Sequence, residues 1–275
     1  MQGKVISTIN IKGGVGKTTT IGCLAELLDE LNKKVLIVDM DPQANISQLF
    51  CRYETGSKNI NDIMMLKGSE CIKDNVKKSI QKTDFGSIDI IASNEELSFV
   101  AQSITFDQSR AQQVILKKAL STIIDDYDYI LIDNTPFFNI LTINSLVASH
   151  YVITPVSSNG FSYAGLTRLL SEIYRIKDEF NPDLVFLGAF ITNANKQKRV
   201  FKDLFEEYKE ELGDKFLHSY IRTDKNVDES NTAFVPLLSY NRNCNAVADY
   251  RRLLASLKIL NAEDQKKLES IIKED

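Results

Sequence analysis

The sequence predicts a three-layer α/β/α fold with a mainly parallel central sheet. Two observations indicate it. Short, β-branched apolar runs such as Lys34–Val38 and Tyr127–Ile132 alternate along the chain with stretches in which apolar residues recur at helical spacing. Both of these runs are followed by an aspartate, and open α/β sheets bind ligands at the carboxyl ends of their parallel strands. Right-handed crossovers would then place helices on both faces of the sheet.

The chain opens with an apolar run at Lys4–Ile11, which predicts the first strand, and an amphipathic stretch at Thr18–Leu31, which predicts the first helix. Between them lies KGGVGKTTT, Lys12–Thr20. Its glycines let backbone N–H groups close on phosphate oxygens without a Cβ in the way, and the helix N-terminus adds partial positive charge. Lys17 supplies a charge for the β- and γ-phosphates, and the Thr18 hydroxyl is placed to bind Mg²⁺. The stretch therefore predicts a phosphate-binding loop and a P-loop NTPase fold.

Two carboxylates follow the second predicted strand. Asp39 and Asp41 come after Lys34–Val38, where an acidic group can face the phosphate loop or cap the next helix. The segment between residues 46 and 107 carries no recognisable motif. Its pattern predicts helices at Asn59–Leu66, at Cys71–Lys82 and from Glu95 onward, and a strand at Ser87–Ala92.

A second acidic strand end lies in the middle of the chain. Apolar residues recur at helical spacing from Gln108 to Asp126, which predicts a helix, and the run Tyr127–Ile132 predicts a buried strand that ends at Asp133. An aspartate here can hold a magnesium-bound water across from Thr18, as in a Walker B motif. The sequence therefore predicts that the phosphate loop and both acidic strand ends share one crevice at the carboxyl edge of the sheet.

The remainder of the chain continues the alternation. Strands are expected at Tyr151–Val156, Val185–Thr192 and Phe216–Ile221, and helices at Ser162–Glu179, Asn195–Leu212, Cys244–Ile259 and Ala262–Lys273. Asn193 can both donate and accept, as recognition of an adenine edge requires, although a loop asparagine is also a common turn residue. His150 and His218 have no carboxylate or serine at a spacing that would indicate a catalytic pair, and both are interpreted as structural. We expect one domain over residues 1–260 and a helical tail over residues 261–275.

The composition excludes several classes of protein. With 275 residues, 43% of them hydrophobic, the chain can bury a large core. A net charge of −4 gives no whole-protein attraction to nucleic acid or to anionic lipid, so such binding would need a local patch. The four cysteines show no CxxC spacing, which argues against a zinc site, an iron–sulfur cluster or a disulfide framework. Because no secretory leader and no run of ~18 apolar residues is recognised, we expect a cytoplasmic protein.

The phosphate loop departs from the general P-loop pattern at one position. G-x-x-x-x-G-K-[ST] would place glycine at position 11, where this chain has Ile11 followed by a second lysine, Lys12. This stretch resembles the deviant Walker A motif of the ParA/MinD family of ATPases, and the resemblance extends from Lys4 to about Leu257. It implies ATP and Mg²⁺ as cofactors. The nucleotide-binding residues that it implies in the loop are Lys12, Gly13, Gly14, Val15, Gly16, Lys17, Thr18 and Thr19.

The same resemblance implies roles for individual side chains. D-x-D-P-Q after the second strand recurs in ParA-like ATPases, so Asp41 is expected to position the attacking water. Asp39 is expected to support the shell of a magnesium ion bound by Thr18 and Asp133. Lys12 is expected to reach across a nucleotide-sandwich homodimer, formed on ATP binding, to the phosphates of the partner. The implied catalytic residues are Lys12, Lys17 and Asp41.

The segment Arg222–Leu238 aligns, by Glu229 and Pro236, with the ParA stretch I-P-R-N-x-x-x-x-E-x-x-x-x-x-x-P. The proline and the asparagine that flank the base in that stretch are Arg222 and Asp224 in this chain. Contacts with the base are therefore expected from Asn193, Arg222 and Asp224.

Three functions are compatible with the resemblance. A ParA/Soj-like partition switch would bind DNA non-specifically on the nucleoid as an ATP dimer, and a ParB-like centromere-binding protein would stimulate its slow hydrolysis. A MinD-like membrane switch needs a basic amphipathic C-terminal helix, but residues 261–275 carry five acidic residues against three lysines. An iron protein similar to nitrogenase reductase needs a cysteine shortly after the Walker B strand, and none lies between Cys71 and Cys244. We favour DNA partition, with MinD-like positioning of cargo or a division site at the membrane as the alternative.

Basic side chains in the last third of the sequence are the candidates for DNA contact, although acidic neighbours such as Glu206 and Glu207 nearly cancel their charge. Because the chain begins at its first strand, we expect non-specific DNA binding rather than operator recognition. The candidates are Lys198, Arg199, Arg222, Lys225, Arg242 and Arg251.

Overall fold

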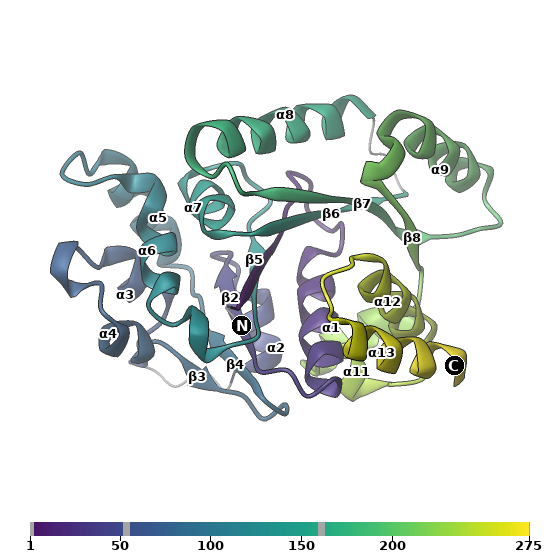
Figure 1. The fold of residues 1–275 in the computed structure, drawn as a ribbon, viewed down its shortest axis with the longest axis horizontal. Helices are drawn as coiled ribbons and strands as arrows, with labels where there is room; N and C mark the ends of the chain where they lie inside the picture. Colours follow the sequence, from purple (N-terminus) through teal and green to yellow (C-terminus); the bar gives the residue numbers. More distant parts are fainter. Residues whose placement is uncertain (1–2, 52–55, 159–162, 275) are drawn as a thin grey trace.

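The computed structural model describes residues 3–51, 56–158 and 163–274. The strands in this part of the chain are β1 Lys4–Thr8, β2 Val35–Met40, β3 Gln81–Lys82, β4 Ile88–Ile91, β5 Tyr129–Asn134, β6 Tyr151–Ser157, β7 Val185–Ala194 and β8 Phe216–Arg222. They form one eight-stranded sheet in the order β3-β4-β2-β5-β1-β6-β7-β8. Every neighbouring pair is parallel except β3 and β4. Helices cover both faces (Figure 1), so the predicted three-layer fold is confirmed.

The helices differ widely in length. The α-helices of the described residues are α1 Lys17–Glu30, α2 Asn45–Phe50, α3 Ile60–Met65, α4 Lys73–Lys77, α5 Leu97–Phe106, α6 Ile115–Ser121, α7 Ile140–Ala148, α8 Tyr163–Phe180, α9 Arg199–Leu212, α10 Lys225–Ala233, α11 Leu237–Tyr240, α12 Asn245–Ser256 and α13 Ala262–Glu274. Short 3₁₀ turns lie at Gly68–Glu70, Gln112–Val114, Ile124–Asp126 and Gly213–Lys215. Across the described ranges, no helix has both the length and the apolar character needed to pass through a bilayer.

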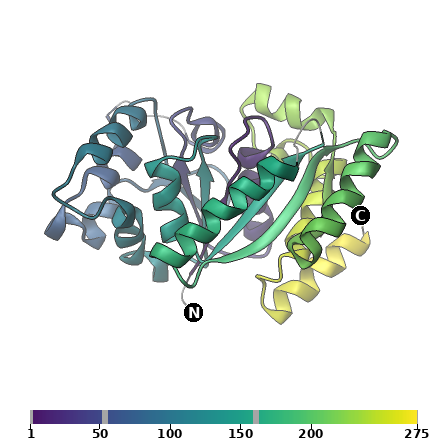
Figure 2. The same cartoon turned by 90° about the horizontal axis from the view of Figure 1, so that it is seen from above.

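The central strands are buried on both faces, which explains why they read as continuous apolar runs. In β2, Ile37 belongs to the same core cluster as Leu28 of α1 on one face, and Leu36 belongs to the same cluster as Leu116 of α6 on the other. A third cluster lies under α8, which covers β6 and β7 (Figure 1). Seen from above, helices α3 to α6 and the C-terminal helices lie at opposite ends of the sheet (Figure 2).

The strand order creates a crevice beside β1. This strand lies between β5 and β6, whereas the chain passes from β1 through α1 to β2, on the far side of β5. Connections that diverge in this way leave a gap at the carboxyl edge of the sheet, where open α/β sheets bind ligands. The parallel register of β2 and β5 also pairs Asp39 with Asp133 at this edge. The fold thus brings the phosphate loop and both acidic strand ends together.

The expected helix over Cys71–Lys82 is wrong in its second half. Gln81 and Lys82 instead pair with Ile90 and Asp89 as a short antiparallel edge strand. This pairing covers backbone groups of β4 that a continued helix would leave without partners.

The expected helix over Gln108–Asp126 is interrupted. Asn144 of α7 accepts a hydrogen bond from the N–H of Leu116 and donates one to the carbonyl of Gln112, so α6 begins only at Ile115. The short or polar helices α2, α7, α10 and α11 were not predicted, because none of them carries the apolar periodicity of a long surface helix.

His150 joins the loop before β6 to β1. Its Nδ1 accepts a hydrogen bond from the N–H of Val5 at 2.9 Å, which requires the unprotonated nitrogen. Burial lowers the pKa of His150, and the nearby Lys117 adds to the shift. The neutral imidazole therefore contributes to the stability of the fold.

We predict that the protein loses more stability than its His150→Asn variant as the pH falls below about 6.5, the usual pKa of histidine. The folded-state pKa is lowered, so the unfolded state binds more protons and stability decreases toward acid pH. The asparagine oxygen can accept from Val5 without titrating. Urea unfolding at a series of pH values measures the difference. His218→Asn, which makes the same change at an exposed position on β8, is the matched control. Identical profiles for the parent and His150→Asn would contradict the assignment.

Candidate nucleotide-binding site

The loop between β1 and α1 has the backbone shape of a phosphate cradle. Gly14 (φ 68°) and Gly16 (φ 84°) adopt the left-handed conformation that favours glycine. A Cβ added at Gly13 or Gly14 would meet no atom of the described residues within 4 Å, so this side of the loop faces open space. Gly16 is the N-cap of α1 and has no side chain to cap the first N–H groups of the helix. An anion in the open space can accept hydrogen bonds from them.

Lys17 begins α1, and its ammonium group lies inside the curve of the loop. The residue is 6% exposed, and Nζ donates to the carbonyl oxygens of Asn10 at 3.1 Å and Lys12 at 3.2 Å. Burial lowers the pKa of Lys17, while the carboxylates of Asp133 and Asp41 oppose the shift. The ammonium group thus lies near both the loop and the acidic strand ends, where it can bind the β- and γ-phosphates.

Thr18 and Asp133 meet at the carboxyl edge of the sheet. Thr18 Oγ1 donates to Asp133 Oδ2 at 2.7 Å. The other oxygen, Oδ1, is buried and accepts no hydrogen bond from the residues that the structure describes. Burial raises the pKa of Asp133 to about 8, and the neighbouring Asp39 adds to the shift. A buried carboxylate oxygen without a donor, next to a hydroxyl group, suits a hard cation.

Asp39 lies beside Asp133 but is held differently. Its Oδ1 accepts from the N–H of Asp41 at 2.9 Å, and its Oδ2 accepts from Ser47 through the N–H at 3.2 Å and the hydroxyl at 2.6 Å. Burial raises the pKa of Asp39 to about 7, against the effect of these hydrogen bonds. Since protein donors bind both oxygens, the geometry fits a supporting position behind a metal ion better than direct coordination.

A magnesium ion fits the pair formed by Thr18 and Asp133. Over residues 3–51, 56–158 and 163–274, no group of three His, Cys, Asp or Glu side chains could hold a metal ion. Mg²⁺ at a nucleotide site needs fewer protein ligands, because phosphates and water supply the others. Thr18 and Asp133 would hold the ion, which when bound neutralises charge on the phosphates.

A cavity of about 370 Å³ opens beside these groups. Its lining includes every phosphate-loop residue from Gly13 to Thr19, as well as Asp41 and Asn193. Asp41 Oδ1 accepts from the N–H of Gln43 at 3.0 Å, which fixes the carboxylate at the cavity. The loop, its lysine and an acidic strand end therefore surround a space in which a nucleoside triphosphate can bind.

Three expected nucleotide contacts lie outside the lining of this cavity. Arg222 pairs with Asp249 of α12, with Nε 2.7 Å from Oδ2. Asp224 caps the first turn of α10 and also accepts a hydrogen bond from the first turn of α12. Lys12 is half-buried, and its N–H donates to Asn10 at 2.9 Å. In this structure Arg222 joins β8 to α12, and Asp224 joins α10 to α12. Their contacts with a base stay a prediction.

Helix α10 supplies part of the cavity wall that sequence reasoning missed. Val227, Asp228 and Asn231 line the cavity together with the phosphate loop. The helix reads KNVDESNTA, which has no apolar stripe. The sequence signal that could have indicated this helix is Asp224, whose side chain accepts a hydrogen bond from the N–H of Asn226 as an N-cap.

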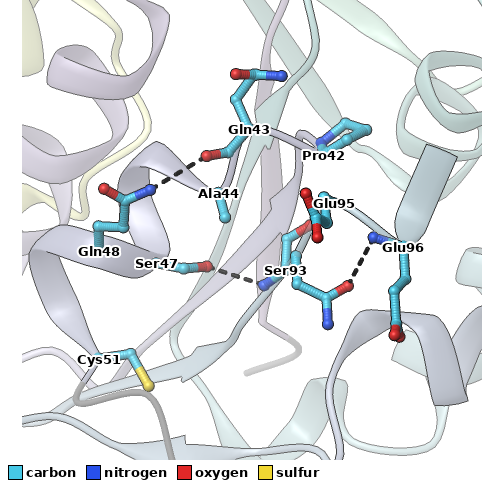
Figure 3. A pocket seen from close by; sticks show the side chains of 10 residues that line it. Pro42, Gln43, Ala44, Ser47, Gln48, Cys51, Ser93, Glu95 and Glu96 are labelled. Atoms are coloured by element: carbon cyan, nitrogen blue, oxygen red, sulfur yellow. Dashed lines mark hydrogen bonds between the residues drawn. The ribbon is translucent and has the colours of Figure 1, made fainter.

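A second cavity, of about 510 Å³, adjoins the loop after β2 (Figure 3). Gln43 contributes to the lining of both cavities. Within the second, the N–H of Ser93 donates to the Ser47 hydroxyl at 2.9 Å (Figure 3), and that hydroxyl donates to Asp39. The charged residues of its lining are both glutamates, so this cavity is unsuited to a triphosphate, which fits the first one.

Arg251 cannot contact DNA, which corrects the expectation from the sequence. It is 2% exposed, and its Nη2 lies 3.4 Å from Glu30 Oε1 of α1. Arg242 pairs with the same glutamate, although its own side chain remains 64% exposed. The candidates that are exposed at the starts of α9 and α10 are Lys198, Arg199 and Lys225.

The chain is similar in sequence to known proteins over most of its length. Residues 3–186 match a family model described as an AAA domain. The chromosome-partitioning ATPase Soj of Treponema pallidum is 30% identical over 252 residues, which are 92% of this chain and 96% of that protein.

Solved structures of similar proteins share the fold. A plasmid partition protein of Borrelia burgdorferi is 28% identical, with a TM-score of 0.72, over 94% of this chain and 100% of that chain. The cobyrinic acid a,c-diamide synthase of Mycobacterium smegmatis, with bound ADP and magnesium, is 26% identical, with a TM-score of 0.71, over 87% of this chain and 91% of that chain.

We predict that Asp133→Asn removes most of the nucleotide affinity that Mg²⁺ adds, because an amide offers the ion no anionic oxygen. The Kd of a fluorescent ATP analogue, measured with Mg²⁺ and with EDTA, gives this gain as a ratio, which should fall about tenfold or more in the variant. Asp128→Asn, an exposed position just before β5, should keep the parent ratio. An unchanged ratio in Asp133→Asn would exclude this carboxylate as a metal ligand.

Proposed function

The chain belongs to the family of ParA/Soj-like P-loop ATPases, and on this premise we propose that it acts as an ATP-dependent switch in DNA partition. As a partition ATPase of this family, it hydrolyses ATP with Mg²⁺. In the proposal, the ATP-bound form is a homodimer that binds DNA without sequence preference. A ParB-like partner stimulates hydrolysis, which releases the dimer from the nucleoid.

The observation that carries the proposal is the convergence of the phosphate loop, its lysine and Asp41 at one cavity, with Asp133 bonded to Thr18 of the cavity lining. The loop N–H groups and Lys17 would hold the phosphates, and Thr18 and Asp133 would hold the metal. Asp41 lies at the same cavity with one oxygen fixed by Gln43, so its other oxygen can orient the attacking water. Burial raises the pKa of Asp41, which makes it a better proton acceptor.

A second copy of the chain would complete the site. Lys17 is the only basic residue among the described residues that line the cavity, and P-loop enzymes gain about 10³–10⁵ in rate from a further cation. The backbone of Lys12 is bonded to Asn10 and Lys17, so any reach toward a partner must come from its side chain. Ile11 is 39% exposed and Phe137 is 68% exposed next to loop and strand-end residues, as an apolar partner-facing surface requires. The exposed side chains of Ile11 and Phe137, together with the single basic residue in the cavity lining, support an ATP-held dimer in which Lys12 binds the partner's phosphates.

We predict that Lys12→Ala abolishes ATP-dependent dimerisation or lowers turnover by about 10³-fold, while nucleotide binding by the monomer persists. Sedimentation with ATP and Mg²⁺ reports the dimer, and phosphate release reports turnover. Lys266→Ala, an exposed position on α13, controls for the loss of one lysine. Parent-like dimers together with parent-like turnover would refute the role of Lys12.

DNA binding in this proposal depends on exposed basic side chains and not on the net charge, which is −4. Lys198 and Arg199 lie at the start of α9, and Lys225 lies at the start of α10. Arg199 pairs with Asp203 at 3.5 Å and Lys225 with Glu229 at 3.3 Å. Such exposed pairs are weak, so phosphate groups can displace them, and a dimer would present each cation twice.

The C-terminal helix α13 supports DNA partition over membrane anchoring. Leu268 is 1% exposed within the core, and Ile272 packs against the same cluster. An amphipathic anchor must offer its apolar face to the lipid. The apolar face of α13 is already used inside the molecule.

We predict that the double variant Lys198→Ala, Arg199→Ala weakens binding to arbitrary DNA equally across sequences. The slope of log K against log[salt] should fall by about 1 for each DNA phosphate group that the variant no longer neutralises. Fluorescence anisotropy with ATP and Mg²⁺, at several salt concentrations, measures both effects. The matched control is Lys266→Ala, Lys273→Ala on α13. Retention of the parent protein on anionic liposomes without any DNA binding would favour the membrane alternative and contradict the proposed role in DNA partition.

A further inference from the structure

We propose that Glu26 of α1 is a positioning residue for ATP, which holds the α10–α11 wall of the nucleotide cavity against the helix that begins at the phosphate loop. By fixing this wall, Glu26 sets the affinity for the nucleotide. The inference rests on the ATPase activity of the chain and is independent of DNA binding.

Glu26 is 5% exposed and caps α11 from a different helix. Its Oε2 accepts from the N–H of Leu238 at 2.8 Å, and its Oε1 accepts from the N–H of Ser239 at 2.8 Å and from the hydroxyl at 2.6 Å. Helix α11 begins at Leu237 after Pro236, whose side chain has no acceptor atom. Its first N–H groups therefore need an acceptor from elsewhere, and Glu26 supplies it.

Helix α11 in turn fixes α10. Asn241, the C-cap of α11, donates through Nδ2 to Asn226 Oδ1 in α10 at 2.9 Å. At the turn between the two helices, Phe234 adopts φ 53° and the N–H of Val235 donates to the carbonyl of Ser230 at 3.1 Å. Because α10 and α11 are joined at both ends, a shift of α11 moves α10 with it.

Helix α10 carries this constraint to the nucleotide cavity. Val227, Asp228 and Asn231 line the cavity together with the first residues of α1. Glu26 lies ~2.5 turns further along the same helix. One rigid helix therefore carries both the phosphate-binding residues and the point to which the wall of the cavity is attached.

A carboxylate is an unfavourable choice if only packing is required at this position. Burial raises the pKa of Glu26, and hydrogen bonds from Leu238 and Ser239 oppose the shift. Those donors are neutral groups, and an apolar contact between two helices is often at least as stable as a buried charge. An apolar contact, however, does not fix direction. The three directional bonds determine the orientation of α11 and hence of the cavity wall.

The test uses Glu26→Gln, which keeps the shape of the side chain but replaces one acceptor oxygen with an NH₂ group facing N–H or O–H donors. We expect the KM for ATP, and the Kd of a fluorescent non-hydrolysable ATP analogue with Mg²⁺, to rise about tenfold. Turnover at saturating ATP should stay within about twofold of the parent, because the catalytic groups are unchanged. Ser239→Ala, which removes only the hydroxyl donor, should raise both constants about threefold and covers the case in which Glu26→Gln folds poorly.

Asp89→Asn is the matched control. Asp89 is a buried carboxylate of β4, 3% exposed, that accepts from Tyr127 and Lys82, and it is absent from the lining of the nucleotide cavity. Its replacement should lower stability but leave the KM for ATP unchanged.

Hydrogen exchange should show faster exchange of residues 225–240 in Glu26→Gln and not in Asp89→Asn. A parent-like Kd in both Glu26→Gln and Ser239→Ala, or an equal rise in Asp89→Asn, would overturn the proposal. No assay here contains DNA, so a negative result leaves the partition switch untouched.

Discussion

Two buried carboxylates side by side are the constraint on which this site depends. The register of β2 and β5 sets Asp39 next to Asp133, and burial raises the pKa of both. Such a pair is unfavourable in a medium of low dielectric constant unless donors or a cation compensate it. Asp39 is compensated by backbone and hydroxyl donors, whereas Asp133 keeps one oxygen without a donor among the described residues. The strand order therefore places a carboxylate oxygen without a donor beside Thr18 of α1, where a divalent ion can bind.

Helix α1 connects this electrostatic centre with the rest of the molecule. Its first residues, Lys17 and Thr18, meet the acidic strand ends. Leu28 packs in the core under the sheet. Glu26 and Glu30 bind the C-terminal helices through α11 and through the arginines that follow it. A single helix thus contacts the phosphate site, the core and the C-terminal part of the chain.

Local sequence predicted the centre of the site, and tertiary contacts decided what it could not predict. The phosphate loop and Asp133 were recognisable because their chemistry depends on residues that are adjacent in sequence. Burial of Arg251 depends on Glu30, in a helix far earlier in the chain, and no local pattern reports such a contact. The polar helix α10 was missed for a related reason, since its order comes from the Asp224 cap and from its contacts with α11. Strand β3 forms by pairing with the edge of β4.

Lys17 is held in place by its own loop. Its ammonium group donates to the loop carbonyls of Asn10 and Lys12, so the positive charge is fixed inside the loop before a triphosphate binds. The loop is therefore preorganised, and binding need not order a flexible side chain before its charge can act.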